Sequence, residues 1–184
     1  MALNIPSRVL HDLGLAAWFG GTLANAVALN RAAGAASDAS STGRVANEGW
    51  NAWTPVNAAA IGLHLGGAIG QLNGNKDRLA TQQGVGTMAI VKTVLTAAAL
   101  GVTAYSRVLG KKVADVPNVP AQSGTEPAAS TPPDIAAAQK QLKALQWAIP
   151  ALTGALVVVT AYAGEQQRPA AVKAGVFERL NPLS

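Results

Sequence analysis

Long stretches without charge are the feature that most constrains how this chain can fold. Asp, Glu, Lys and Arg are missing from residues 13–30, 49–75, 79–106 and 144–164, apart from Lys92 in the third stretch. Each stretch has roughly 18 residues or more, and an α-helix of that length, at 1.5 Å per residue, matches the ~30 Å hydrocarbon core of a bilayer. The pattern predicts an all-α, integral membrane four-helix bundle.

Composition supports this interpretation. Only 12% of the residues are charged, about half the fraction in ordinary soluble domains. A soluble Ala/Gly-rich bundle is the alternative, but its helices should carry a charged outer face, which these stretches lack. The net charge of +5 comes from basic residues that flank the apolar stretches, which suits lipid headgroups and not nucleic acid.

The predicted helices cover residues 9–29, 54–72, 84–109 and 135–163 of a single membrane domain, 1–184. The start of the chain resembles a secretory signal, with small residues at 33–37, but we interpret it as the first span. Four spans place both termini on one side of the membrane, and the basic residues do not decide which side that is.

Several residues set the expected helix ends. Trp50 and Trp53 are typical of a membrane interface, and Thr54-Pro55 suits a helix start. Pro150 should bend the fourth helix. The Pro-rich segment 113–133 should form an extended, solvated linker, and the tail 164–184 should lie on the membrane surface.

Small residues predict one close helix contact. Residues four apart lie on one side of a helix, and small-x-x-x-small ridges let transmembrane helices approach closely. We therefore expect the first two helices to pack through two such ridges, which are formed by Gly62, Gly66 and Gly70 and by Ala17, Gly21, Ala24 and Ala28.

Polar residues form stripes on three of the predicted helices. Their seven-residue spacing is the one that left-handed bundle packing keeps in register, so the stripes should face one shared interior. They consist of Asn57, His64 and Gln71; of Lys92, Thr96, Ala99 and Thr103; and of Gln146, Thr153 and Thr160.

Counting residues from the helix ends places His64 and Lys92 at one level, about 12 Å into the membrane. Asp12 enters from the same side and Glu165 lies just beyond, so these four residues form the candidate ligand or ion cluster. Charge inside a membrane is costly and marks functional sites. The alternative is structural: Lys92 would extend to the headgroups and His64 would hydrogen-bond across the bundle.

No metal site or cofactor is predicted. The chain has no cysteine and only two histidines, which excludes disulfides and thiolate ligands. His11 should lie near the membrane surface and His64 about two helical turns deeper, a poor match for the two axial ligands of one haem.

One motif resembles a known family. His11, followed by Trp18-Phe19-Gly20-Gly21, is similar to the opening helix of CopD-type copper-resistance proteins and DUF4149-type membrane proteins. The resemblance covers about eleven residues and implies handling of a small solute or metal. The other helices offer no Met-rich or multi-His copper site.

The sequence leaves several functions open. We expect a non-enzymatic, multi-pass protein of the bacterial inner membrane, acting as an accessory subunit beside other membrane chains or copies of itself. The alternative is a small carrier or binding protein that uses the polar interior around His64 and Lys92. A lipid-acting enzyme is a third possibility, but no motif orders Asp12, His64 and Lys92 into a catalytic set.

Overall fold

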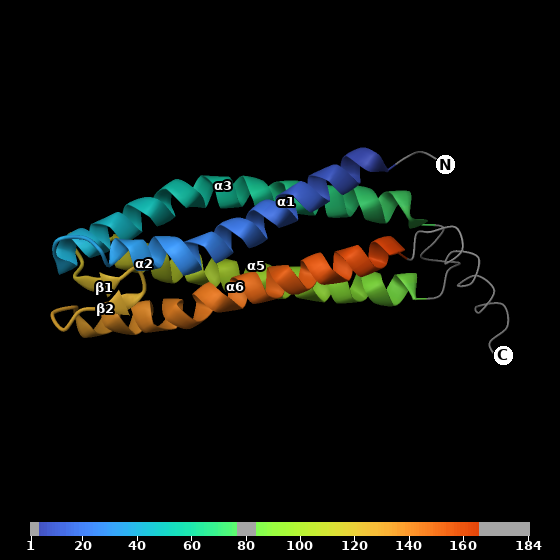
Figure 1. Ribbon diagram of the computed structural model, residues 1–184. Coiled ribbons are helices and arrows are strands. Elements are labelled where there is room, and N and C mark those ends of the chain that lie inside the picture. The colour runs from blue at the N-terminus through green and yellow to red at the C-terminus, as the bar shows by residue number, and fades with distance from the viewer. Residues whose placement is uncertain (1–3, 77–83, 166–184) are drawn as a thin grey trace.

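The computed structural model describes residues 4–76 and 84–165, so most of the predicted tail, 164–184, lies outside the described residues. Four long helices run side by side along one axis (Figure 1). The only strands among the described residues form a small hairpin at one end. The predicted all-α fold is confirmed.

The first helical rod is α1 (Ile5–Ala24), which continues through a π-helical turn, η1 (Asn25–Leu29), into the short α2 (Asn30–Ala33). It starts four residues before the predicted boundary, with a proline in its first turn, where the missing N–H needs no partner. Its buried side carries His11, Gly14 and Trp18.

The second long helix, α3 (Ala39–Gly74), begins fifteen residues before the predicted start at residue 54. Asp38 caps it by accepting hydrogen bonds from Ser41 N–H at 2.8 Å and Ser41 Oγ at 2.9 Å. These bonds, with one from Ser37, lower the pKa of the Asp38 carboxyl. Thr54-Pro55 therefore lies inside a helix, where the Thr54 hydroxyl donates to Trp50 O at 2.8 Å.

The other two long helices are α5 (Val85–Ala114) and α6 (Pro133–Glu165), close to the predicted ranges. Between them, the segment expected to be a solvated linker folds onto the bundle. Its strands β1 (Ala121–Ser123) and β2 (Glu126–Pro127) pair antiparallel, and Val119 is buried against Leu109 and Ile135. The linker prediction was wrong because Val119 joins a core formed by α5 and α6, and because the two strands pair with each other.

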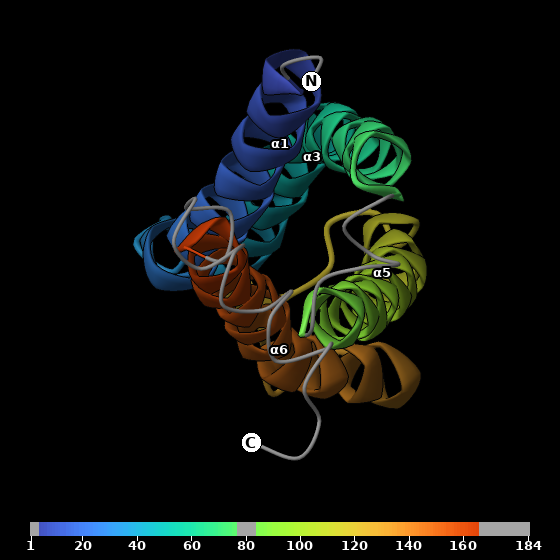
Figure 2. The ribbon, with the colours of Figure 1, turned by 90° about the vertical axis from the view of Figure 1, so that its right-hand side faces the viewer.

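The helices are arranged as two pairs. α1 packs along α3, α5 packs along α6, and α1 also contacts α6, whereas α3 and α5 barely touch. Viewed along the bundle, the ribbons of α3 and α5 lie apart, whereas α1 lies close to α3 and α5 lies close to α6 (Figure 2). We call the end where α1 begins and α6 ends the terminus side, and the end with the hairpin the loop side.

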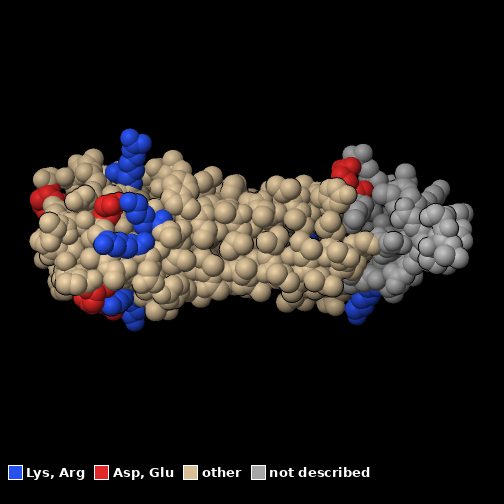
Figure 3. All heavy atoms as spheres, turned by 90° about the horizontal axis from the view of Figure 1, so that it is seen from below, with Lys and Arg blue, Asp and Glu red and all other residues tan. Residues whose placement is uncertain are grey.

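Charged residues gather at the two ends of the molecule, and the face shown in Figure 3 has a long middle section almost free of them. Among the described helices, α5 and α6 are long and apolar enough to cross a membrane. These two helices suggest membrane association. The same test does not select α1 or α3, so the predicted four-span arrangement is not confirmed by it.

Candidate functional site

Glycines bring α1 and α3 into backbone contact. A Cβ atom at Gly14 would overlap the backbone of Ala60 and His64, and one at Gly67 would overlap that of Ser7 and His11. Only glycine allows this approach, because any other side chain would force the helices apart. The contact places His11 beside His64.

The ridges predicted from four-residue spacing do not make this contact. At Gly62 and Gly66 an added Cβ would meet no atom within 4 Å, although Gly70 packs on Ser7 and Gly21 packs under the Trp53 ring. The three alanines of the other predicted ridge, Ala17, Ala24 and Ala28, are exposed. The prediction that these helices pair was sound, but the faces were largely wrong.

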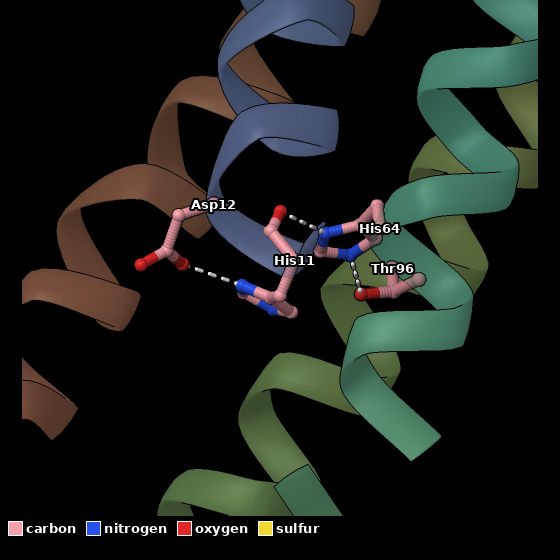
Figure 4. A network of polar contacts seen from close by, with 4 residues as sticks. All are labelled: His11, Asp12, His64 and Thr96. Carbon is pink, nitrogen blue, oxygen red and sulfur yellow. Dashed lines mark hydrogen bonds and ion pairs between the residues drawn. The ribbon is translucent and has the colours of Figure 1, made fainter. Parts of the chain in front are cut away.

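The two imidazoles form a buried pair at the centre of the site (Figure 4). Their ring centroids are 4.3 Å apart, and each side chain is 1% exposed. His11 Nδ1–H donates to Asp12 Oδ1 at 2.7 Å. His64 Nδ1–H donates to the His11 carbonyl at 3.3 Å, and the Thr96 hydroxyl lies 3.4 Å from His64 Nε2.

These bonds leave one nitrogen without a partner. With Nδ1 of His11 protonated and bonded to Asp12, Nε2 of the neutral ring carries a lone pair. This atom is buried and makes no hydrogen bond within the part of the chain that the structure describes. His11 therefore presents a hydrogen-bond acceptor to whatever occupies the adjoining space.

The expected separation of the two histidines is overturned. His11 was placed near the surface and His64 two turns deeper, yet the rings are in contact. Residue counting failed because the first helix begins at Ile5 and not at residue 9, and because the exact register of two helices depends on their contact face. Rings this close cannot hold one haem iron between them.

A cavity of about 430 Å³ opens beside the histidine pair on the terminus side. All four long helices line it. Its walls are mostly apolar, as in Leu65 and Leu72, and its polar lining residues include His11, Asp12 and Lys92. Gln71 and Thr160 also line it, and their Nε2 and Oγ1 atoms are buried without a partner among the described residues. We call it the terminus-side cavity.

Lys92 is the cation of this cavity that most needs explanation. It is half-buried, seven residues or about 10 Å into α5. Among the ion pairs of the described residues, none involves Lys92, and the Asp12 carboxylate is bonded to His11. An ammonium group in such a place is costly unless a ligand or water pairs with it.

The structure brings together most of the predicted cluster. Asp12 and Lys92 line the cavity. His64 packs on His11, does not line the cavity, and contacts Thr96 instead of Lys92. Glu165 is exposed at the end of α6. Sequence reasoning missed His11 as a site residue. Its seven-residue relation to Trp18 on the buried side of α1 was the available signal.

The predicted polar stripes do face the interior. Asn57 and Gln71 have buried polar atoms, Thr153 is fully buried, and Thr96 and Thr160 line the terminus-side cavity. Within residues 4–76 and 84–165, no three His, Cys, Asp or Glu side chains are placed to share a metal ion.

Comparison with family models, with curated proteins and with solved structures finds no match. The resemblance at His11 and Trp18-Phe19-Gly20-Gly21 therefore stays a prediction.

Proposed function

We propose that this chain crosses the membrane four times and binds a small amphiphilic anion, such as a monocarboxylate, in the terminus-side cavity. The observation that carries the proposal is the Lys92 ammonium group, which lines an interior cavity and forms no ion pair within 4.0 Å among the described residues. The Asp12 carboxylate of the same cavity is near enough to attract Lys92, but its bond is to His11. The proposal favours the carrier or binding role over the accessory subunit expected first.

The four-span arrangement is supported by the length and exposure of the helices. α1 and α3 run beside α5 and α6 along the same axis. Large apolar side chains are exposed on the outside of both pairs, such as Leu13, Leu63, Val94 and Val158. An apolar outer surface on all four helices is what lipid requires.

The chemistry of the cavity favours an anion with an apolar body. Lys92 supplies a charge-assisted hydrogen-bond donor, His11 Nε2 accepts from a protonated acid or a hydroxyl, and Gln71 Nε2 is a further donor. The leucines and alanines of the wall suit a short hydrocarbon chain. At about 430 Å³ the cavity is within the usual size range of small-molecule sites, ~300–1,000 Å³.

The first prediction tests the charge of Lys92. Octanoate should raise the unfolding temperature of the full chain in phosphatidylcholine nanodiscs, and octanamide, which has the same shape without charge, should not. Lys92→Met should abolish the octanoate effect, and Lys92→Arg should keep part of it. Lys111→Met is the matched control, because Lys111 is an exposed lysine of the same helix and does not line the cavity.

Two results would contradict the proposal. Equal effects of octanoate on wild type and on Lys92→Met would show that the ammonium group does not bind the anion. The accessory-subunit role would be supported if octanoate had no effect and a stable protein partner co-purified in mild detergent with both wild type and Lys92→Met.

A further inference from the structure

A second cavity, of about 290 Å³, lies on the loop side of the bundle between α3 and α5. The two cavities share one lining residue, Leu100, and the histidine pair does not line the second cavity. It is lined by other residues of the same helices and by the hairpin at Gly124 and Thr125. We call it the loop-side cavity.

Four polar atoms in its wall are buried and have no hydrogen-bond partner in residues 4–76 and 84–165: Trp53 Nε1, Asn57 Oδ1, Thr103 Oγ1 and Ser106 Oγ. The first two belong to α3 and the other two to α5, so they come from the two helices that barely touch. Buried polar groups in proteins are nearly always paired, and a cluster of exceptions around one cavity indicates a missing partner.

Two hydroxyls on α5, like that of Thr160 at the terminus-side cavity, lack the bond that several other helical hydroxyls make. Hydroxyls of Thr22, Thr54, Thr93 and Thr153 all donate to a carbonyl of their own helix, at 2.7 to 2.9 Å. Helical Ser and Thr commonly satisfy themselves in this way. Thr103 and Ser106 do not, so their hydroxyls remain available to a ligand.

The chemistry of the four groups is that of a site for an uncharged polyhydroxyl group. The indole N–H is a donor, the amide oxygen is an acceptor, and each hydroxyl can be both. A sugar ring has the same mixture of donors and acceptors around an apolar body, and the indoles of Trp50 and Trp53 provide flat apolar surfaces in the same cavity. Among the described residues, no carboxylate lines the cavity. Arg107 lines it, but this side chain is exposed.

The position of the cavity suits a membrane headgroup. Indole rings are enriched at the level of lipid headgroups, and Trp50 and Trp53 line this cavity, which lies between α3 and α5, the two helices with few mutual contacts. We infer that the loop-side cavity binds the uncharged polyhydroxyl group of a glycolipid headgroup or of a free sugar. A headgroup as the source rests on the membrane arrangement in the proposed function, whereas the residues and the ligand of this cavity differ from those of the terminus-side cavity.

Native mass spectrometry of the full chain, purified without sugar detergents, tests this inference. The chain is released from phosphatidylcholine nanodiscs that contain either monoglucosyl diacylglycerol or diacylglycerol with the same acyl chains. We expect adducts with the glucosyl lipid that saturate on titration, and few with diacylglycerol. Competition by free glucose, or binding of glucose alone, separates the two sources of the polyhydroxyl group.

Two substitutions locate the site. Asn57→Leu and Thr103→Val should each weaken glucosyl-lipid binding roughly three- to tenfold, the effect of one lost hydrogen bond. Thr153→Val is the matched control, because that hydroxyl is bonded within its own helix and lines neither cavity. It should leave the affinity unchanged.

Three results would overturn the inference: no binding of either the glucosyl lipid or glucose, equal binding of diacylglycerol, and unchanged affinity in both Asn57→Leu and Thr103→Val. None of them bears on the octanoate test of Lys92, because the ligands and the substituted residues differ.

Discussion

Single residues decide how closely α1 and α3 approach. Gly66 and Gly67 are adjacent glycines with different surroundings. An added Cβ atom would meet nothing within 4 Å at Gly66, but it would overlap the α1 backbone at Gly67. Spacing in the sequence favoured Gly66, because residues 62, 66 and 70 repeat every fourth position. The structure uses Gly67, together with Gly14 on the other helix.

The adjacent pair allows a sharp stability test. Gly67→Ala should lower the free energy of unfolding by about 1–3 kcal/mol, since the new methyl group has no space beside the His11 backbone. Gly66→Ala should be neutral or stabilising by up to ~1 kcal/mol, since alanine favours a helix over glycine. Thermal unfolding in detergent, followed by circular dichroism, measures both. If Gly66→Ala lowered the free energy of unfolding more than Gly67→Ala, the result would support packing through the predicted ridge of Gly62, Gly66 and Gly70.

At the scale of elements, a seven-residue repeat organises the first pair of helices. On α3, the Ala60 backbone lies against Gly14 of α1, Gly67 lies against the backbone of Ser7 and His11, and Gly74 lies against Asn4 at the N-cap of α1. This is the repeat of left-handed helix packing, and the polar stripe of Asn57, His64 and Gln71 follows it too. The stripe was predictable because few polar residues occur within the apolar stretches. Small residues are so common in this chain that several faces of each helix could form a packing ridge.

Asn30 joins several elements on the loop side. It is 3% exposed, donates to Gln146 Oε1 at 2.6 Å and accepts from Trp50 Nε1 at 2.9 Å. Its backbone carbonyl accepts from Gly124 N–H at 2.9 Å. Its side chain therefore connects α2 with α3 and α6, and its backbone connects α2 with the hairpin.

Removing this side chain should be costly. Asn30→Ala should reduce the free energy of unfolding by about 2–3 kcal/mol, because it leaves the Trp50 and Gln146 groups without partners. Asn51→Ala, at an exposed position of α3, should change it by less than about 0.5 kcal/mol. Urea or thermal unfolding compares the two variants. Similar small losses in both would show that the side-chain bonds of Asn30 contribute little.

At the scale of the whole molecule, the number of spans determines which loops share a side. With four spans, the turn between α2 and α3 and the hairpin loop lie on the same side, and the end of α3 lies on the other. If only α5 and α6 crossed the membrane, the turn between α2 and α3 would lie with the end of α3.

Single cysteines can distinguish these arrangements, because the chain has no cysteine of its own. Ser37→Cys, Ser130→Cys and Asn73→Cys place a thiol at exposed positions in the three segments. In sealed vesicles of one orientation, a membrane-impermeant maleimide reaches only one side of the membrane. It should therefore label either both Ser37→Cys and Ser130→Cys, or Asn73→Cys alone. Labelling of Ser37→Cys together with Asn73→Cys would contradict four spans.

The sequence by itself determined the helical architecture, the pairing of α1 with α3 and the inward direction of the polar stripes. Charge-free length and polar periodicity are local properties, so they can be read along the chain. Only the tertiary structure decided that His11 meets His64, that the Pro-rich segment folds onto the bundle, and that Lys92 lines a cavity. Those features depend on how helices that are far apart in the sequence are aligned with one another. For α1 and α3, the close contacts at Gly14 and Gly67 set this alignment.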